Sequence, residues 1–204
     1  MQTVTSLLAA FQDRLVRSRE TDPVALAEIA AMLHNWPQPF ALSQRTVPYQ
    51  QPVCRHLDAA LDAALRGPES AITAAIIPAI ATLRWTYGYP FQPRWPDLAN
   101  TIGFAQLIGP TGLMDDAQLH IGLTLMAPAT HYPMHSHPAI ETYLVLSGTA
   151  LWRVTGAPFV AKPPGSLIVH ADGIGHAMET TDTPLLALFV WRGDLVTAPV
   201  YVDD

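Results

Sequence analysis

Histidines are concentrated in one short part of this 204-residue sequence. Five of the eight histidines fall between residues 131 and 176. The stretch HYPMHSHPAIETYLVLSG at 131–148 holds three of them, together with a glutamate and two tyrosines. A strand that only had to fold would place alternating Val, Ile and Thr there instead. The composition of this stretch therefore indicates chemistry as well as packing.

The spacing of these groups suits a metal site. His135 and His137 are two residues apart, so on an extended strand their side chains project to the same face, and Glu141 and Tyr143 repeat that relation. Two imidazoles, a carboxylate and one further imidazole from a neighbouring strand would offer three nitrogens and one oxygen to a divalent metal. His176 is the candidate for that further imidazole. Burying these groups without a cation would be costly.

Helices are expected in the first half of the chain. SLLAAFQDRLVRSRE and DPVALAEIAAMLHNW repeat apolar positions at helical spacing, and the second opens with Asp22 as N-cap and Pro23 at the first helical position. A proline-rich connector at 36–52 precedes two more helical runs, the second interrupted by Pro78. We expect about four helices, followed by an aromatic segment at 88–101 that could cover a barrel mouth.

The second half changes to short strands. From about residue 103, β-rich runs such as LHIGLTLMA, TYLVLSG and LLALFVWRG are separated by Gly, Pro and Asp turns. This pattern is typical of an antiparallel barrel or sandwich. The sequence predicts a mainly β fold in which a helical N-terminal extension, residues 1–100, precedes one β-barrel with the metal site, residues 101–204.

Two motifs in the second half resemble those of the cupin superfamily. HSHPAIETYLVLSG reads as H-x-H-x3-E-x6-G, similar to the first cupin motif, and GSLIVHADGIGHAMET resembles the second. The resemblance implies a single double-stranded β-helix, or jelly-roll, barrel. Three positions depart from the motifs without removing a metal ligand: Ala129 for glycine, Ala171 for proline and Thr180 for asparagine.

Finer features resemble one group of cupins, the dimethylsulfoniopropionate lyases of the DddQ and DddL types. These features are Tyr132, Tyr143, Trp191 and the helical N-terminal region. The resemblance implies β-elimination of a sulfonium zwitterion to dimethyl sulfide and acrylate. It also implies a metal held by the ligand set His135, His137, Glu141 and His176, with Tyr143, as base or additional ligand, or Tyr132 as the catalytic base.

Elementary chemistry agrees with these roles. The ordinary tyrosine pKa of about 10 is too high for a base at neutral pH, but a nearby divalent cation favours the phenolate. Aromatic rings could hold the sulfonium by cation–π contact, and the candidates are Trp191, Trp152, Tyr87 and Tyr89. Ligand types do not decide among Zn, Fe, Mn, Ni and Co.

Other interpretations remain open at this stage. The same ligands would serve a cupin dioxygenase acting on a small organic acid or thiol, or a non-catalytic cupin that binds a small molecule. Tyr143, Trp191 and Trp152 could simply fill the barrel. His131 and His170 have no motif position, so we expect them on the surface or beside the ligands.

Composition excludes several classes of partner. The net charge is −6, with one lysine and ten arginines, and residues 1–100 hold eight arginines and eight acids. No basic surface is therefore expected for nucleic acid. No run is long and apolar enough for a membrane span, and no address label is recognisable, so a cytoplasmic location is expected. The lone Cys54 is expected to be a small buried hydrophobe, and a homodimer is the commonest assembly at this size.

Overall fold

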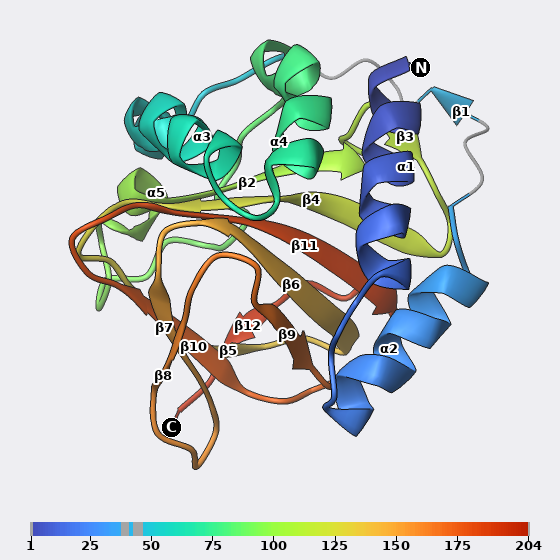
Figure 1. Ribbon diagram of the computed structural model, residues 1–204. Helices are drawn as coiled ribbons and strands as arrows, with labels where there is room; N and C mark the ends of the chain where they lie inside the picture. Colours follow the sequence, from blue (N-terminus) through green and yellow to red (C-terminus); the bar gives the residue numbers. More distant parts are fainter. Residues whose placement is uncertain (1, 38–40, 43–46, 204) are drawn as a thin grey trace.

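Helices predominate in the first half of the chain and strands in the second half (Figure 1). The computed structural model describes residues 2–37, 41–42 and 47–203, so part of the connector at 36–52 lies outside the described residues. The helical segments are α1 (Gln2–Val16), α2 (Pro23–His34), the 3-10 helix η1 (Pro52–His56), α3 (Leu57–Leu65), α4 (Ser70–Ile76), the 3-10 helix η2 (Ile77–Thr82) and α5 (Leu98–Thr101). Among the described residues, no helix has the length and apolar character needed to cross a membrane.

The helix boundaries follow the local signals in the sequence. The Asp22 carboxylate accepts a hydrogen bond from the Ala25 N–H at 2.9 Å, and Pro23 occupies the first turn of α2. The α-helix α4 ends at Ile76, and Pro78 lies in the first turn of η2. Because proline has no N–H to donate, the α-helical ladder cannot continue through it. The predicted cap and the predicted interruption are both confirmed.

Within the described residues, twelve strands form two sheets. The strands are β1 (Ala41–Leu42), β2 (Ile102–Ile108), β3 (Met114–Asp115), β4 (Leu119–Met126), β5 (His131–Ser136), β6 (Ala139–Ser147), β7 (Ala150–Val154), β8 (Val160–Lys162), β9 (Leu167–His170), β10 (His176–Thr180), β11 (Leu185–Gly193) and β12 (Val200–Tyr201). One sheet has the order β1-β3-β2-β4-β11-β6-β9 and the other β12-β5-β10-β7-β8. The mainly β architecture with a helical N-terminal part is confirmed.

The larger sheet has two different faces. Its outer face, formed on β6 and β11 by residues such as Leu144 and Leu188, belongs to one apolar cluster with helical residues such as Leu61 and Ile72. Figure 1 shows α1, α3 and α4 lying over this face. Its inner face carries alternate residues of the same strands and packs against the smaller sheet. The helices therefore support the sheet from behind the site.

Two departures from the cupin motifs meet at one loop. Ala129 has a φ of 52°, a left-handed conformation that favours glycine, and its N–H donates to the Thr181 carbonyl at 2.7 Å. The Thr180 hydroxyl accepts from the Thr130 N–H at 2.9 Å and donates to the Ala127 carbonyl at 2.6 Å. The Thr180 hydroxyl thus holds the loop that leads into β5, where the histidine pair begins.

Candidate metal centre and aromatic pocket

The candidate ligands come from three strands that antiparallel pairing places around the barrel interior, and His137 lies in the short connection between β5 and β6. His176 at the start of β10 lies opposite His135 on β5. On the other sheet, Glu141 of β6 lies between Trp191 of β11 and His170 of β9 in the strand register. Because side chains alternate along a strand, these residues point to the interior face of their sheets. The fold thus gathers groups that are distant in the sequence, such as Glu141 and Trp191, which are 50 residues apart.

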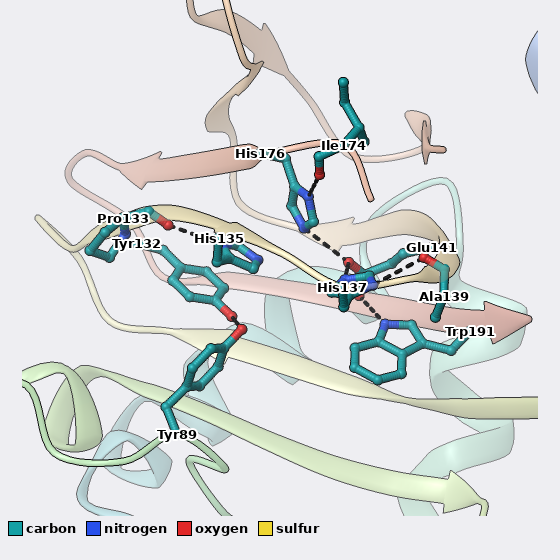
Figure 2. Close-up of polar contacts among 10 residues, drawn as sticks. All are labelled: Tyr89, Tyr132, Pro133, His135, His137, Ala139, Glu141, Ile174, His176 and Trp191. Atoms are coloured by element: carbon teal, nitrogen blue, oxygen red, sulfur yellow. Dashed lines mark hydrogen bonds and ion pairs between the residues drawn. The ribbon is translucent and has the colours of Figure 1, made fainter. Parts of the chain in front are cut away.

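Three of the predicted ligands form one compact group. The potential ligand atoms of His137, Glu141 and His176 all lie within 4.8 Å of one another, and all three residues are buried. The Glu141 Oε2 atom is 3.0 Å from His137 Nε2 and 3.2 Å from His176 Nε2 (Figure 2). These side chains could hold a metal ion.

Hydrogen bonds to the backbone fix how each imidazole is protonated. His137 Nδ1 lies 3.0 Å from the Ala139 carbonyl oxygen, and His176 Nδ1 lies 3.0 Å from the Ile174 carbonyl oxygen. A carbonyl oxygen only accepts, so each Nδ1 carries the donated proton. In the neutral ring, each Nε2 then carries a lone pair, and both Nε2 atoms face the same carboxylate oxygen. Facing lone pairs require a proton or a cation among them, and this arrangement is typical of metal-binding histidines.

The separations also suit a shared ion. Ligand atoms bound at about 2.1 Å to one ion are about 3 Å apart when they subtend a right angle. The two separations from Glu141 Oε2 are 3.0 and 3.2 Å. His176 Nε2 is moreover buried, and among the described residues its 3.2 Å contact with Glu141 Oε2 does not have the geometry of a hydrogen bond. The donor set and its spacing therefore fit a metal ion.

His135 is placed beside this group and does not join it. Its Nδ1 likewise donates to a carbonyl, that of Pro133 at 2.9 Å, so its Nε2 is free of a proton in the neutral ring. Its ring centroid is 4.0 Å from that of His176 but 6.4 Å from that of His137. The Tyr132 ring stacks on it at 3.9 Å. Of the four predicted ligands, His137, Glu141 and His176 form the compact group, and His135 lies at its edge.

Glu141 is held as an anion. Burial raises the pKa of its carboxyl group, but the neighbouring imidazoles of His137 and His176 outweigh that effect when an Nε2 atom carries a proton, and they lower the pKa well below its usual value. The indole Nε1–H of Trp191 donates to the second carboxylate oxygen, Oε1, at 2.6 Å (Figure 2). The Trp191 ring also lies 4.3 Å from the His137 ring. Trp191 therefore orients the carboxylate while one oxygen faces the histidines.

Both candidate tyrosine bases are buried at the site. Burial, followed by the negative charge of Glu141, raises the pKa of Tyr143 well above its usual value. Burial also raises the pKa of Tyr132 well above 10, with further contributions from Tyr89 and Tyr143. The Tyr132 hydroxyl is hydrogen-bonded to the Tyr89 hydroxyl (Figure 2). Without a positive charge nearby, both phenols stay protonated at neutral pH.

A small aromatic cavity of about 190 Å³ opens beside these groups. Among the described residues, its lining includes no lysine or arginine. It is lined by Thr86, Tyr87, Gly88, Tyr89, Phe104, Gln106, Thr111, Tyr132, His135, His137, Glu141, Tyr143, Phe189, Trp191 and Pro199. The aromatic segment at 88–101 was expected to cover the barrel mouth. Its first two residues, Gly88 and Tyr89, line the cavity, as does Tyr87 directly before it. The cavity offers mainly aromatic faces and the metal-binding group.

The structure separates the remaining predicted residues. Trp152 is buried behind Tyr143, with ring centroids 4.8 Å apart, and is not among the residues that line the cavity. His131 is exposed and pairs with Glu179 at 2.8 Å. His170 is buried, and its ring stacks on that of His176 with centroids 4.1 Å apart. Of the two expected placements, on the surface or beside the candidate ligands, His170 takes the second.

Some cavity residues were not singled out from the sequence. Phe104 and Gln106 on β2 and Phe189 on β11 lie on the inner face of the large sheet. Their alternation with buried aliphatic residues marks them as one face of a strand. However, the pairing of β2 with β4 and of β4 with β11, which brings them to the site, could not be deduced from one sequence.

The chain is similar to proteins of one enzyme family. The dimethylsulfoniopropionate lyase family matches residues 24–187. The protein named dimethylsulfoniopropionate lyase DddL, from Cereibacter sphaeroides, is 36% identical over 148 residues, which cover 72% of this chain and 61% of that protein. Dimethylsulfoniopropionate lyase DddQ from Ruegeria pomeroyi is 37% identical over 131 residues, covering 64% and 65%. The alignments thus span less than two thirds of the length of either relative.

Solved structures extend the similarity to nearly the whole chain. A chain from crystal structures of the dimethylsulfoniopropionate lyases RdDddP and RnDddQII superposes with a TM-score of 0.75 at 25% identity, covering 98% of both chains. The crystal structure of DddQ from Ruegeria pomeroyi gives a TM-score of 0.66 at 31% identity, covering 89% of this chain and 98% of that one. The fold is the single cupin barrel that the motifs predicted, and the chain belongs to the dimethylsulfoniopropionate lyase family.

Proposed function

We propose that this chain is a metal-dependent lyase that cleaves dimethylsulfoniopropionate by β-elimination into dimethyl sulfide and acrylate. The observation that carries the proposal is the convergence of three ligand side chains beside an aromatic cavity, which His137 and Glu141 line. Relatives in the family that are named as dimethylsulfoniopropionate lyases support it.

The proposed cofactor is one divalent ion among Zn, Fe, Mn, Ni and Co. His137, Glu141 and His176 would hold it, with His135 as the fourth ligand. When bound, the ion would supply a Lewis acid for the substrate carboxylate and a positive charge that favours a nearby phenolate. The part played by the chain is to present unprotonated Nε2 atoms, because the Nδ1 protons are engaged by backbone carbonyls.

The proton to be removed lies on the carbon next to the substrate carboxylate. The hydroxyl oxygen of Tyr143 or of Tyr132, as the phenolate, would accept that proton. The electron pair of the C–H bond then forms the double bond of acrylate. The bond from the next carbon to sulfur breaks, and its electrons leave with sulfur as neutral dimethyl sulfide. Atoms and charge balance without an oxidant.

The aromatic rings of the cavity would bind the sulfonium group. Tyr87, Tyr89 and Trp191 line the cavity and offer ring faces to a cation, a contact that contributes about 0.5–2 kcal/mol. No cationic residue among the described cavity residues opposes a positive headgroup. We leave Trp152 out of the binding set because it packs behind Tyr143.

The first test is dimethyl sulfide release without oxygen. The metal-free protein is loaded in turn with Zn, Fe, Mn, Ni or Co and incubated with dimethylsulfoniopropionate under nitrogen, and headspace gas is measured by chromatography. We expect release that requires metal and is absent in His137→Ala. Release only in the presence of oxygen would favour the dioxygenase alternative. No release with any of the five metals would reject the proposed substrate.

A second test separates the lyase from a non-catalytic binding protein. Tyr143→Phe and Tyr132→Phe each remove one hydroxyl, and Tyr49→Phe on the surface is the matched control. We expect the variant that lacks the base to lose about 10²–10⁴-fold in turnover while its metal content stays at the wild-type level. Wild-type turnover in both variants would reject a tyrosine base.

The remaining expectations are part of this proposal. We propose that residues 1–100 act as a helical extension of the barrel formed by residues 101–204. The partner is a small zwitterionic substrate, with neither nucleic acid nor membrane involved, in a cytoplasmic enzyme. A homodimer is the expected assembly, which light scattering of the purified chain would measure.

A further inference from the structure

The C-terminal strand lies directly against the strand that carries the site. In β12, Val200 pairs with Ser136 and Tyr201 with His135 of β5, and the Val202 N–H donates to the Met134 carbonyl at 3.0 Å. Figure 1 shows β12 beside β5 at the edge of the smaller sheet. Residues 200–202 are thereby held next to the candidate metal centre.

Tyr201 contacts the cavity wall from outside. Its ring stacks on the Tyr89 ring at 4.8 Å with an interplanar angle of 28°, and it lies 5.1 Å from the Trp95 ring. Its hydroxyl is hydrogen-bonded to the hydroxyl of Tyr87. Tyr87 and Tyr89 line the cavity, whereas Tyr201 is not among the lining residues. Tyr201 therefore contacts two residues of the cavity wall, Tyr87 and Tyr89, without lining the cavity itself.

The backbone around Tyr89 has few constraints of its own. The bridge between Thr86 and Phe104 is followed by Gly88, whose φ is +80°, and by a bend at Tyr89. Within the described residues, positions 87–91 form no backbone–backbone hydrogen bond. The position of Tyr89 therefore depends on what its side chain contacts. Its ring centroid lies nearer to that of Tyr201, at 4.8 Å, than to that of Tyr87, at 5.3 Å.

Tyr89 in turn contacts Tyr132. The two hydroxyls are hydrogen-bonded, and the rings meet edge to face at 6.0 Å (Figure 2). Tyr132 then stacks on His135 at 3.9 Å. A continuous series of ring contacts thus runs from Tyr201 through Tyr89 to a candidate base and a candidate ligand.

We propose that Tyr201 is a positioning residue, which holds Tyr89 in place and, through it, the Tyr132 hydroxyl at the cavity. The inference rests on the proposed function for its effect on catalysis. Its structural part, the ordering of the segment around Tyr89, is independent of that function. A misplacement of about 1 Å at a reacting group can cost about 100-fold in rate.

The kinetic test compares ring loss with hydroxyl loss. Tyr201→Leu removes the ring, and Tyr201→Phe keeps the stack on Tyr89 but loses the hydroxyl. We expect kcat for dimethyl sulfide release to fall about tenfold or more in Tyr201→Leu and about threefold or less in Tyr201→Phe, with KM and metal content close to wild type. Tyr49→Leu is the control and keeps wild-type kcat. Equal kcat in Tyr201→Leu and wild type would overturn the inference.

A double-mutant cycle tests the route of the effect. If Tyr201 acts through the Tyr89 hydroxyl, Tyr201→Leu should reduce kcat by only about threefold or less in a Tyr89→Phe background. A mere loss of folding stability would give the same factor in both backgrounds. Additive effects in this cycle would therefore also contradict the proposal.

A proteolysis experiment tests the structural part without any activity. Arg94 is exposed and adjoins Trp95, which packs on Tyr201. We expect trypsin to cleave after Arg94 about fivefold faster or more in Tyr201→Leu than in wild type or Tyr201→Phe, because cleavage follows the population of the open segment. An inactive wild-type enzyme would reject the proposed function alone. Equal cleavage in all three proteins would reject the role of Tyr201.

Discussion

The two faces of strands β6 and β11 carry opposite kinds of side chain. On the outer face, Leu144 and Leu188 pack with the helices in an aliphatic cluster. One residue away on the inner face, Tyr143 and Phe189 line the cavity, and Glu141 faces the histidines. Because successive residues of a strand point to opposite sides, one strand can serve folding and chemistry without compromise between them. The comparison predicts that mutations on the two faces have separable effects.

The largest expected effect is on the inner face. In Glu141→Gln the anionic ligand is lost, and we expect activity to fall by at least about 10³-fold, beyond the 10–100-fold typical of residues that only support metal ligands. The glutamine amide can still donate to the histidine Nε2 atoms, so unfolding of the metal-free protein should change by only about 1 kcal/mol. Dimethyl sulfide release, metal analysis and urea unfolding measure these quantities. Activity within tenfold of wild type would show that Glu141 is not a metal ligand.

The matching change on the outer face should lower stability strongly and leave activity nearly unchanged. Leu188 is fully buried among the helices and the large sheet. We expect Leu188→Ala to lower the free energy of unfolding by about 2–5 kcal/mol through lost contacts and a cavity. The folded fraction should keep a kcat within about twofold of wild type. A large kcat loss with little loss of stability would show that the faces are not independent.

Acidity should act mainly on the inner face in the metal-free protein. Burial lowers the pKa of His135 and of His170 well below 6.5, and the nearby His176 adds to this. Below pH 6.5 the unfolded chain binds protons that the folded chain does not. Stability is therefore present above that pH and falls as the pH decreases, by at most about 1.4 kcal/mol per pH unit for each imidazole.

Urea midpoints measured between pH 7.5 and 5 with a chelator present would detect this loss. His170→Phe removes one buried imidazole and should reduce the dependence on pH. His34→Gln, on the exposed surface of α2, is the matched control and should leave it as in wild type. The same slope in His170→Phe and wild type would contradict the assignment to the inner face.

The smallest expected effect lies outside both faces, in the loop before β5. Ala129 has a φ of 52°, which costs a non-glycine residue about 1–2 kcal/mol. We expect Ala129→Gly to raise the free energy of unfolding by about 0.5–1 kcal/mol and to leave kcat unchanged. Ala161→Gly in the exposed strand β8 should instead lower the free energy of unfolding. Destabilisation by both changes would argue against relief of strain at residue 129.

Much of the architecture was readable because its signals are local. The Asp22 cap, the break at Pro78 and the change from helical to strand period depend on residues close together in the chain. The candidate ligands His137 and Glu141 share one strand-turn-strand segment, and the resemblance to the second cupin motif added His176 as a candidate; the structure brings the three together. These features could be predicted because spacing and residue type fix them.

The features that could not be predicted depend on how strands that are distant in the sequence pair. The placement of Phe104 and Gln106 on the cavity wall follows from the pairing of β2 with β4. The contact between Tyr201 and Tyr89 requires the C-terminal strand to add to β5. The separation of Trp152 from the cavity depends on which rings pack in front of it. A single sequence carries no signal for such pairings, since many registers satisfy the same alternation.

The hydrogen bond from Trp191 to Glu141 constrains how this cavity could be enlarged. The indole is both a wall of the cavity and the partner of the carboxylate, so trimming it to admit a bulkier molecule would also release Glu141. Phe189 lines the same cavity, and a Cβ at Gly122 would lie only 2.4 Å from its ring. Phe189 makes no such bond to Glu141, so a redesign for larger substrates would begin at Phe189 and keep Trp191.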